Sequence, residues 1–237
     1  AALSGFEKKF QVLDLPYLFT SKAAAFKALD GELGKTLDAL LPKHGIVNLC
    51  YFENGFRHVT NNRKPIRVPA DMKGLKIRTM ENPMHIAFFK GLGANPTPMN
   101  YGEVYTALQQ GTIDAQETPI ALVFDAKFFE VQKYYSLTGH VFSATMLVAN
   151  KPFMDKLPKD LNAIVMKAAR DFAIENRKAV DKLEGTALAA MKKKGLQVNT
   201  LTDAEKNQFV KAALPVYSQF EGVLGKDLIE LAKKANH

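Results

Sequence analysis

The chain has 237 residues, of which 47% are hydrophobic and 24% are charged, and its formal net charge is +8. This composition is typical of a folded globular protein with a sizeable core, and it excludes a disordered chain. No run of apolar residues is long enough for a membrane-spanning helix. The basic residues are scattered rather than gathered into a stripe with aromatic residues, which argues against a nucleic-acid partner.

The first quarter of the chain predicts a helical region followed by extended chain. Apolar residues recur at helical spacing over 20–41, with a break near Gly31. The apolar run Ile46–Phe52 holds β-branched and aromatic residues and predicts a buried strand, so its cysteine is expected to be a buried thiol without a disulfide. A second extended segment follows over 55–61, and the polar, proline-bearing stretch 61–72 is the best linker candidate.

The middle of the chain alternates predicted strands and helices with short turns, which favours a parallel sheet covered by helices. Asn100 and Glu103 have the spacing of a capping box at the start of one helix, and Gly111 follows its end. In chain order, the elements are a strand over Leu75–Thr79, a helix over 83–90, extended chain over 94–99, a helix over 104–110, a strand over Ile113–Gln116, a helix over 119–133 and mostly extended chain over Tyr135–Ala149.

Two strand ends in this region share one local pattern, in which a strand runs into Glu, then Asn or Thr, then Pro, and then a helix. The two copies are Glu81–Pro83 and Glu117–Pro119. Asn82 and Thr118 are predicted N-caps, and proline is suited to the first helical position. Each junction therefore presents free backbone N–H groups and the positive end of a helix dipole.

Arg78 lies at the end of the first of these strands, three residues before Glu81. Ligands of open parallel sheets bind at the carboxyl ends of the strands, and a guanidinium beside helix N-termini suits a carboxylate. The sequence therefore predicts a carboxylate receptor at Arg78. The alternative is a surface arginine that pairs with Glu81 or Glu117.

The tail of the chain predicts long helices. One apolar stripe runs through 158–194, and an unbroken helix of that length would measure about 55 Å, which suits a strut between two lobes. Thr202 and Glu205 have capping-box spacing at the start of a last helical region, in which Pro215 predicts a kink.

Five stretches of the chain resemble, in the same order, the periplasmic solute-binding proteins of TRAP (tripartite ATP-independent periplasmic) transporters: Val12–Phe19, Asn54–Ile66, Asp71–Pro83, Gly93–Glu117 and Phe128–Ser143. The resemblance implies a two-lobed α/β fold that closes on its ligand, with hinge strands and a long helix bridging the lobes. It also implies a periplasmic protein, secreted by a signal peptide not present in this chain, that captures a small organic acid and delivers it to the membrane permease subunits.

The domain organisation that the resemblance implies has three parts. Residues 1–55 and 143–183 form lobe I with the bridging helix, residues 56–142 and 184–202 form the ligand-binding lobe II, and residues 203–237 form a C-terminal helical segment that packs across the lobes.

The resemblance also implies the roles of four site residues. Arg78 corresponds to the arginine that clamps a carboxylate, and Arg57 to a second arginine in the hinge strand. For Arg57, the alternative is to tie the hinge strand to a neighbouring carboxylate. Tyr101 corresponds to an aromatic residue that lines the pocket. Thr118 stands where the family often has Asn, so its ligand contact is expected to be shorter or bridged by water.

Glu81 and Asn82 complete the set of predicted ligand contacts because they share a strand–helix turn with Arg78. Their alternative role is to cap the helix and to build the framework. We expect no catalytic residue, no metal and no cofactor, since the histidines lack metal-ligand spacing and the chain has no Gly-x-Ser-x-Gly, Walker or dinucleotide motif.

The predicted first lobe contains only about two strands, Ile46–Phe52 and part of Val141–Ala149, which make a poor sheet alone. We therefore expect this lobe to be incomplete, either because the chain is truncated or because another chain completes it by strand swapping or dimerisation.

Two other functions remain open from the sequence. One is an α/β enzyme acting on a small acid, with Glu81 or Glu117 as the base, and the other is a chain that self-assembles without ligand. The residues do not distinguish dicarboxylates, hydroxy or oxo acids, and sugar acids as the solute.

Overall fold

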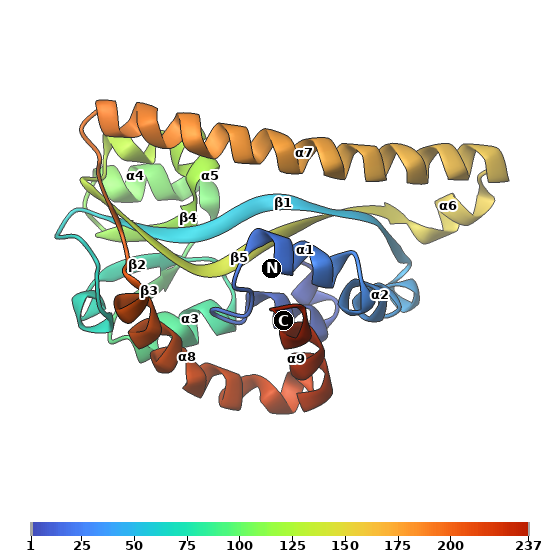
Figure 1. The fold of residues 1–237 in the computed structure, drawn as a ribbon, viewed down its shortest axis with the longest axis horizontal. Coiled ribbons are helices and arrows are strands. Elements are labelled where there is room, and N and C mark those ends of the chain that lie inside the picture. The colour runs from blue at the N-terminus through green and yellow to red at the C-terminus, as the bar shows by residue number, and fades with distance from the viewer. Residues whose placement is uncertain (1, 237) are drawn as a thin grey trace.

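The computed structural model describes residues 2–236, and a mixed six-stranded sheet with the order β3-β2-β4-β1-β5-β6 forms its centre (Figure 1). β2 is parallel to β3 and β4, whereas β1 is antiparallel to both β4 and β5, and β5 is parallel to β6. The predicted parallel sheet is therefore confirmed around β2 and wrong for the long strands. The strands are β1 (Ile46–Asn61), β2 (Lys76–Thr79), β3 (Asn95–Pro98), β4 (Ala115–Pro119), β5 (Tyr134–Asn150) and β6 (Gln197–Thr200).

β1 and β5 cross the molecule as two long antiparallel strands. The predicted strand Ile46–Phe52 and the extended segment after it form one strand of 16 residues, and β5 has 17. The pairing of β1 with β5 shifts register at three places, between Asn48 and Cys50, between Glu53 and Gly55, and between Arg57 and Val59. Gly55 has a φ of 105°, which a residue with a side chain rarely adopts, so this bulge depends on glycine.

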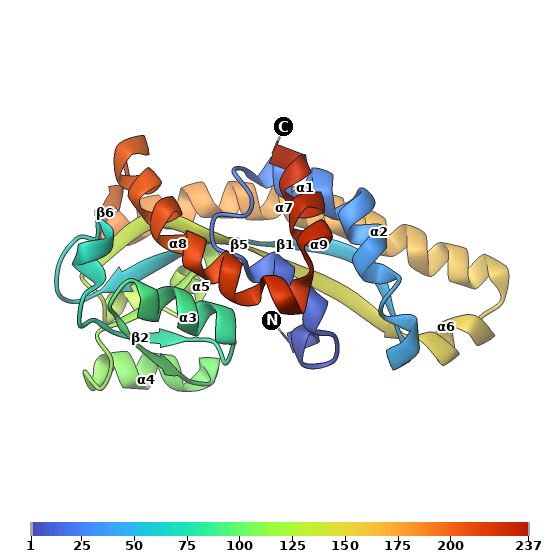
Figure 2. The ribbon, with the colours of Figure 1, turned by 90° about the horizontal axis from the view of Figure 1, so that it is seen from below.

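The α-helices lie on both sides of the sheet (Figure 1). The helix α7 extends along one side together with α4 and α5, and Figure 2 shows α8 crossing the opposite side of the molecule before the chain turns into α9. The helices are α1 (Lys22–Leu29), α2 (Glu32–Asp38), α3 (Pro83–Gly91), α4 (Val104–Gln109), α5 (Ile120–Asp125), α6 (Lys151–Lys156), α7 (Lys159–Lys193), α8 (Asp203–Leu224) and α9 (Lys226–Lys233).

The predicted long helix is confirmed as α7, whose 35 residues span roughly 50 Å. It is held to β1 by hydrogen bonds, because the Asn176 side chain accepts from the Glu53 backbone N–H at 2.7 Å and Arg177 donates to the Tyr51 carbonyl at 2.9 Å. Arg177 also forms a bidentate ion pair with Asp30 at the end of α1. None of the helices in residues 2–236 is long and apolar enough to cross a membrane.

The first Glu-Asn-Pro junction forms as predicted. The Asn82 side chain caps α3 by accepting a hydrogen bond from the Met84 backbone N–H at 2.9 Å. The predicted capping box at Asn100 is wrong, because its side chain makes no cap hydrogen bond and a 3-10 turn over Tyr101–Glu103 precedes α4 instead. Gly111 ends this helix with a φ of 70°, as expected.

The second junction differs from the first. Thr118 is not an N-cap, because β4 continues through Pro119 and α5 begins at Ile120 without a side-chain cap. The helix predicted over 119–133 ends at Asp125, since Lys127 adopts a left-handed φ of 55° and a 3-10 turn follows. At the remaining predicted cap, the Thr202–Glu205 capping box is present, and α8 continues through Pro215.

In the described part of the chain, the hydrophobic core consists of two main clusters and a small third one. The large cluster joins the N-terminal segment to α1, α2, α3, α8 and α9, and the second joins α4, α5 and the C-terminal part of α7. The small one holds Cys50, which is buried as predicted, against Ala169 and Ala173 of α7. The N-terminal turn Lys8–Asp14 packs in the large cluster beside α8 and α9, and it also contacts β5 and the helix α3 that follows β2.

Candidate functional site

A cavity of about 660 Å³ lies between the N-terminal segment, the ends of β2 and β4, and the middle of β1 and β5. β2 and β4 are parallel neighbours, so their carboxyl ends meet at one edge of the sheet, as the sequence predicted for the ligand site. Four of the six predicted site residues line this cavity, namely Arg57, Arg78, Tyr101 and Thr118.

Arg78 is the third residue of β2, and it is only 4% exposed. Its Nε and Nη2 both donate to the Met99 carbonyl, at 3.0 and 2.7 Å, and its guanidinium lies 5.9 Å from the centre of the Tyr101 ring. Burial lowers the pKa of Arg78 from its ordinary value, but a guanidinium remains charged. Within residues 2–236 it forms no ion pair with any carboxylate, neither Glu81 nor Glu117. Part of its donor edge is therefore left for a ligand.

Arg57 lines the same cavity from β1, but its charge is already paired. Its Nε donates to Glu117 Oε2 at 2.6 Å and its Nη2 to Glu117 Oε1 at 2.9 Å, and Nη2 also reaches the Glu117 carbonyl at 2.5 Å. Both side chains are almost fully buried. The bidentate pair ties the long strand β1 to β4, which is the alternative role that the sequence left open for Arg57.

Glu117 is the centre of a buried network that reaches the N-terminal segment. Burial alone would raise its pKa, but Arg57 and the two histidines around it hold the pKa of Glu117 well below its ordinary value. His140 Nε2 lies 2.9 Å from Glu117 Oε2, and His85 Nδ1 lies 3.6 Å from Oε1. His85 Nε2 in turn lies 3.3 Å from Asp14 Oδ1.

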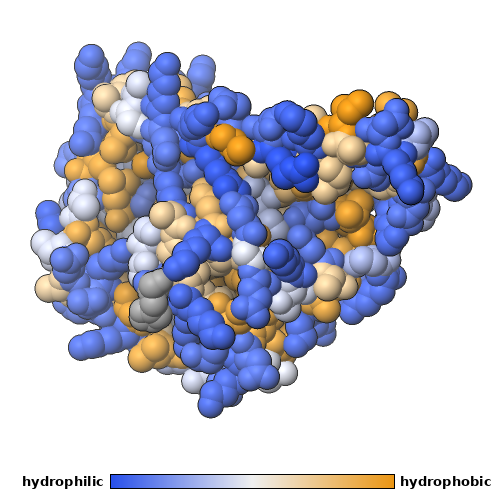
Figure 3. Space-filling model, turned by 45° about the vertical axis from the view of Figure 1, so that its right-hand side comes forward, coloured by the Kyte–Doolittle hydropathy of each residue, from blue (hydrophilic) through white to orange (hydrophobic). Residues whose placement is uncertain are grey.

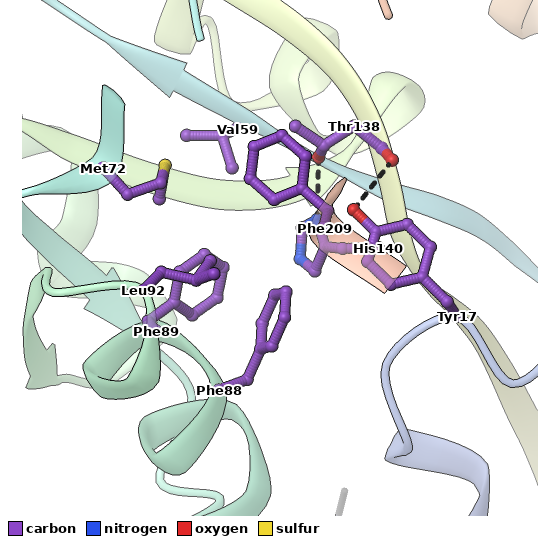
Figure 4. Close-up of a pocket in the computed structure, with 9 residues that line it drawn as sticks. All are labelled: Tyr17, Val59, Met72, Phe88, Phe89, Leu92, Thr138, His140 and Phe209. Carbon is purple, nitrogen blue, oxygen red and sulfur yellow. Dashed lines mark hydrogen bonds between the residues drawn. The ribbon is translucent and has the colours of Figure 1, made fainter. Parts of the chain in front are cut away.

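His140, which contacts Glu117, is held in a packed and mostly apolar pocket shown in Figure 4. Its ring stacks on Phe88, and its Nδ1 lies 2.8 Å from the Thr138 hydroxyl, whose backbone carbonyl accepts from Tyr17 at 3.4 Å. Burial lowers the pKa of His140, which favours the neutral ring. The ionised Glu117 can only accept, so His140 donates from Nε2 and accepts the Thr138 hydroxyl proton at Nδ1.

Tyr101 and Thr118 line the cavity next to Arg78. Tyr101 is 42% exposed, its hydroxyl donates to the Leu122 carbonyl at 3.4 Å, and its ring packs edge-on against Phe128. Thr118 is 1% exposed, and its hydroxyl is buried without a hydrogen-bond partner among the described residues. A buried hydroxyl without a partner is uncommon in folded proteins, which makes Thr118 a candidate for a ligand contact.

The two remaining candidates, Glu81 and Asn82, do not line the cavity. Glu81 is exposed. Asn82 is buried, and its side chain is already used, because it accepts from Met84 and donates to Asp14 Oδ2 at 2.7 Å. The structure thus gives Asn82 the capping and framework role that the sequence left open for it.

Several cavity residues were not singled out from the sequence: Asp14, Asn54, Ser143 and Thr145. Asp14 lies within the resembling stretch Val12–Phe19, and the other three lie on β1 and β5. Asn54 donates to the Ser143 hydroxyl at 3.2 Å, across the two strands. The signal for this pair was the polar residues inside otherwise apolar strands.

A second cluster of charges lies outside the cavity, where Lys22 of α1 meets Glu53 of β1 and Asp181 and Glu184 of α7. The three carboxylates could hold a metal ion, because one oxygen of each lies within 4.8 Å of the others. The Lys22 ammonium contacts all three at 2.6 to 2.7 Å and supplies the positive charge there. The Lys22 side chain therefore links α1 to both β1 and α7 through ion pairs.

The fold and this cavity are those of a solute receptor, and the chain belongs to the bacterial extracellular solute-binding proteins, family 7 (DctP), which it matches over residues 1–222. It is 45% identical over 209 residues to the 2,3-diketo-L-gulonate-binding periplasmic protein YiaO of Escherichia coli, which covers 88% of this chain and 63% of that protein. A solute-binding protein of Verminephrobacter eiseniae is 43% identical over 98% of this chain and 69% of its own length. The chain therefore spans about two thirds of these curated relatives.

Solved structures show the same relationship. A TRAP periplasmic solute-binding protein of Shewanella oneidensis with bound succinate superposes with a TM-score of 0.94 at 34% identity, over 99% of this chain and 77% of the other. The sugar acid binding protein DctPAm of Advenella mimigardefordensis in complex with galactonate has a TM-score of 0.93 at 36% identity, with the same coverage.

These comparisons confirm the predicted family and the predicted α/β fold. The family consists of solute-binding proteins rather than enzymes, and curated relatives are periplasmic proteins, as the sequence predicted. The enzyme alternative with Glu81 or Glu117 as a base is therefore wrong.

Proposed function

We propose that this protein captures a small organic acid in the periplasm for a TRAP-type transporter, with Arg78 as the anchor of the ligand carboxylate. The observation that carries this proposal is the Arg78 guanidinium, which is buried in the wall of a large cavity without a carboxylate partner among residues 2–236. A buried cation without a counter-charge is costly, and a bound carboxylate offsets that cost. Relatives hold succinate, galactonate and D-erythronate.

The neighbours of Arg78 suit the same role. Two of its N–H groups are fixed on the Met99 carbonyl, so the plane of the guanidinium is set before a ligand arrives. The free hydroxyl of Thr118 and the half-exposed ring of Tyr101 border the same space. In this proposal the carboxylate bonds to the remaining donors of Arg78 and to Thr118, and Tyr101 covers it.

Closure of the cavity follows from the proposed domain division. Residues 1–55 and 143–183 form one lobe and residues 56–142 and 184–202 the other, and β1 and β5 cross from one to the other near Gly55 and Ser143. Bending there would bring the N-terminal segment over the ends of β2 and β4 and exclude water from the ion pair. The closed receptor then delivers its solute to membrane permease subunits.

The test is titration calorimetry of Arg78→Gln with D-erythronate and D-galactonate. Loss of the ion pair is expected to weaken binding by about 3 kcal/mol or more, which is over a hundredfold. The matched control is Arg67→Gln, because Arg67 is an exposed arginine that does not line the cavity and whose removal changes the net charge equally. Unchanged affinity in a folded Arg78→Gln protein would refute the anchor role.

A second copy of the chain is our proposal for the partner of the first lobe. Among residues 2–236, the first part of β1 pairs only with β5, so this described ribbon has two strands and open edges. Apolar side chains are exposed nearby, at the end of the molecule formed by α6 and the start of α7 (Figure 3), and they include Phe153, Leu161 and Ile164. Light scattering is expected to give a dimer, and a monomer at micromolar concentration would contradict this.

A further inference from the structure

The charges around the cavity suggest which acids it accepts. Of the described residues that line it, only Asp14, Arg57 and Arg78 carry a formal charge. Arg57 is paired through two hydrogen bonds with Glu117, directly behind the cavity wall. The Asp14 carboxylate is turned toward Asn82 and His85: its Oδ2 accepts from the Asn82 amide at 2.7 Å, and its Oδ1 lies 3.3 Å from His85 Nε2.

The buried group made by Arg57, Glu117, Asp14 and His85 has no surplus positive charge. Two carboxylates face one guanidinium and one imidazole, so the sum is zero when His85 is protonated and −1 when it is neutral. Arg78 is therefore the one uncompensated cation at the cavity among the residues described. One cation of this kind is matched by a single ligand carboxylate.

The rest of the wall is uncharged. Its apolar part includes Phe10 and Phe142, and its polar part includes Asn54, Ser143 and Thr145, on the two long strands. Hydroxyl and amide groups bond well to ligand hydroxyls. A second carboxylate would instead lose its water next to aromatic rings or meet the like charge of Asp14, and both outcomes disfavour binding.

We propose that the cavity selects acids with one carboxylate and an uncharged, hydroxyl-bearing body, and discriminates against dicarboxylates of the same length. This inference rests on the proposed function, because it assumes that Arg78 anchors the ligand. It narrows the solute to a class that the sequence did not distinguish.

The test compares acids that differ only at the far end. D-Erythronate and meso-tartrate form one pair, D-galactonate and galactarate a second, and 4-hydroxybutanoate and succinate a third; in each pair a terminal hydroxymethyl group becomes a carboxylate. Titration calorimetry at pH 7.5 is expected to show the monocarboxylate binding at least tenfold more tightly in each pair that binds. Equal or tighter binding of the dicarboxylate would overturn the inference and leave the receptor function intact. Binding of none of the six acids would overturn both.

A variant separates charge from shape. Thr145→Lys adds a cation to the half-buried β5 wall of the cavity, and Thr145→Gln adds similar bulk without charge. The preference is the ratio of the dissociation constants of the dicarboxylate and the monocarboxylate in each pair. The lysine variant is expected to lower this ratio at least threefold, and the glutamine variant to preserve it. If both variants change the preference equally, shape rather than charge sets it, and the inference is overturned.

Discussion

Replacing Glu117 with Gln tests the buried network around the cavity. The amide keeps the shape of the side chain but removes the negative charge. Arg57, which is 2% exposed and donates both Nε and Nη2 to this carboxylate, then keeps a buried charge without its counter-charge. His85, 3.6 Å from the same carboxylate, loses a partner as well.

The expected loss for Glu117→Gln is about 3–5 kcal/mol of unfolding free energy, the usual effect of removing one partner of a buried ion pair. For a chain of this size, this corresponds to a fall in melting temperature of roughly 6–20 °C. Urea denaturation followed by circular dichroism measures the first quantity, and a thermal scan the second.

Two controls make this prediction specific. Asp171→Asn breaks the exposed ion pair of Asp171 with Lys167 and is expected to change stability by less than about 0.5 kcal/mol. The double variant Arg57→Met with Glu117→Gln removes both charges and is expected to lose less than the sum of the two single variants. A Glu117→Gln protein within about 1 kcal/mol of the parent chain would refute the assigned importance of the pair.

Three further predictions concern the strand ribbon and the buried histidines. Lys22→Met leaves three neighbouring carboxylates without their cation and is expected to lower the free energy of unfolding, measured by urea denaturation, by about 2–3 kcal/mol. Adding Glu53→Gln should recover part of this loss, and no recovery would contradict the stabilising role of the Lys22 ion pairs. Gly55→Ala is expected to cost more than about 1 kcal/mol, because its φ is 105° and the new Cβ would lie 2.7 Å from the Glu184 carboxylate; unchanged stability would contradict a glycine requirement. Burial lowers the pKa of His58 to about 3 and also lowers that of His140, so the unfolded chain binds protons that the folded chain excludes. The two neutral histidines therefore contribute their full stabilisation above the ordinary histidine pKa of about 6.5. The free energy of unfolding is expected to fall by about 1–2 kcal/mol between pH 6 and pH 5, and a free energy that does not change with pH would contradict this.

The elements of the middle region could be predicted from the sequence because their signals are local. The strand that carries Arg78 is bounded by a helix start at Asn82 and Pro83, and both caps and prolines act over a few residues. The second junction shows the limit of this reasoning. Proline can end a strand as well as begin a helix, and Pro119 has the extended ψ of 160° that keeps it in β4.

The strand directions and the buried network could not be predicted, because both depend on distant residues. Arg57 and Glu117 are 60 residues apart, and Asn82 and Asp14 are 68 residues apart. From the sequence, Arg57 could contact the ligand or have a structural role. The pairing of β1 with β4 brings the Glu117 carboxylate to the Arg57 guanidinium, and the sequence alone does not show this pairing. The role of Arg78 as an unpaired cation likewise depends on which carboxylates the fold places out of its reach.

The continuity of β1 and β5 constrains how the molecule can move. The two halves of the ribbon are joined by paired strands, whose register is irregular near Gly55 and Arg57, and not by a flexible linker. A ribbon of this kind resists stretching but bends and twists where its hydrogen-bond ladder is interrupted. Solute capture should therefore appear as a bend of modest angle in this ribbon near Gly55, with amide protons beside the register irregularities exchanging fastest.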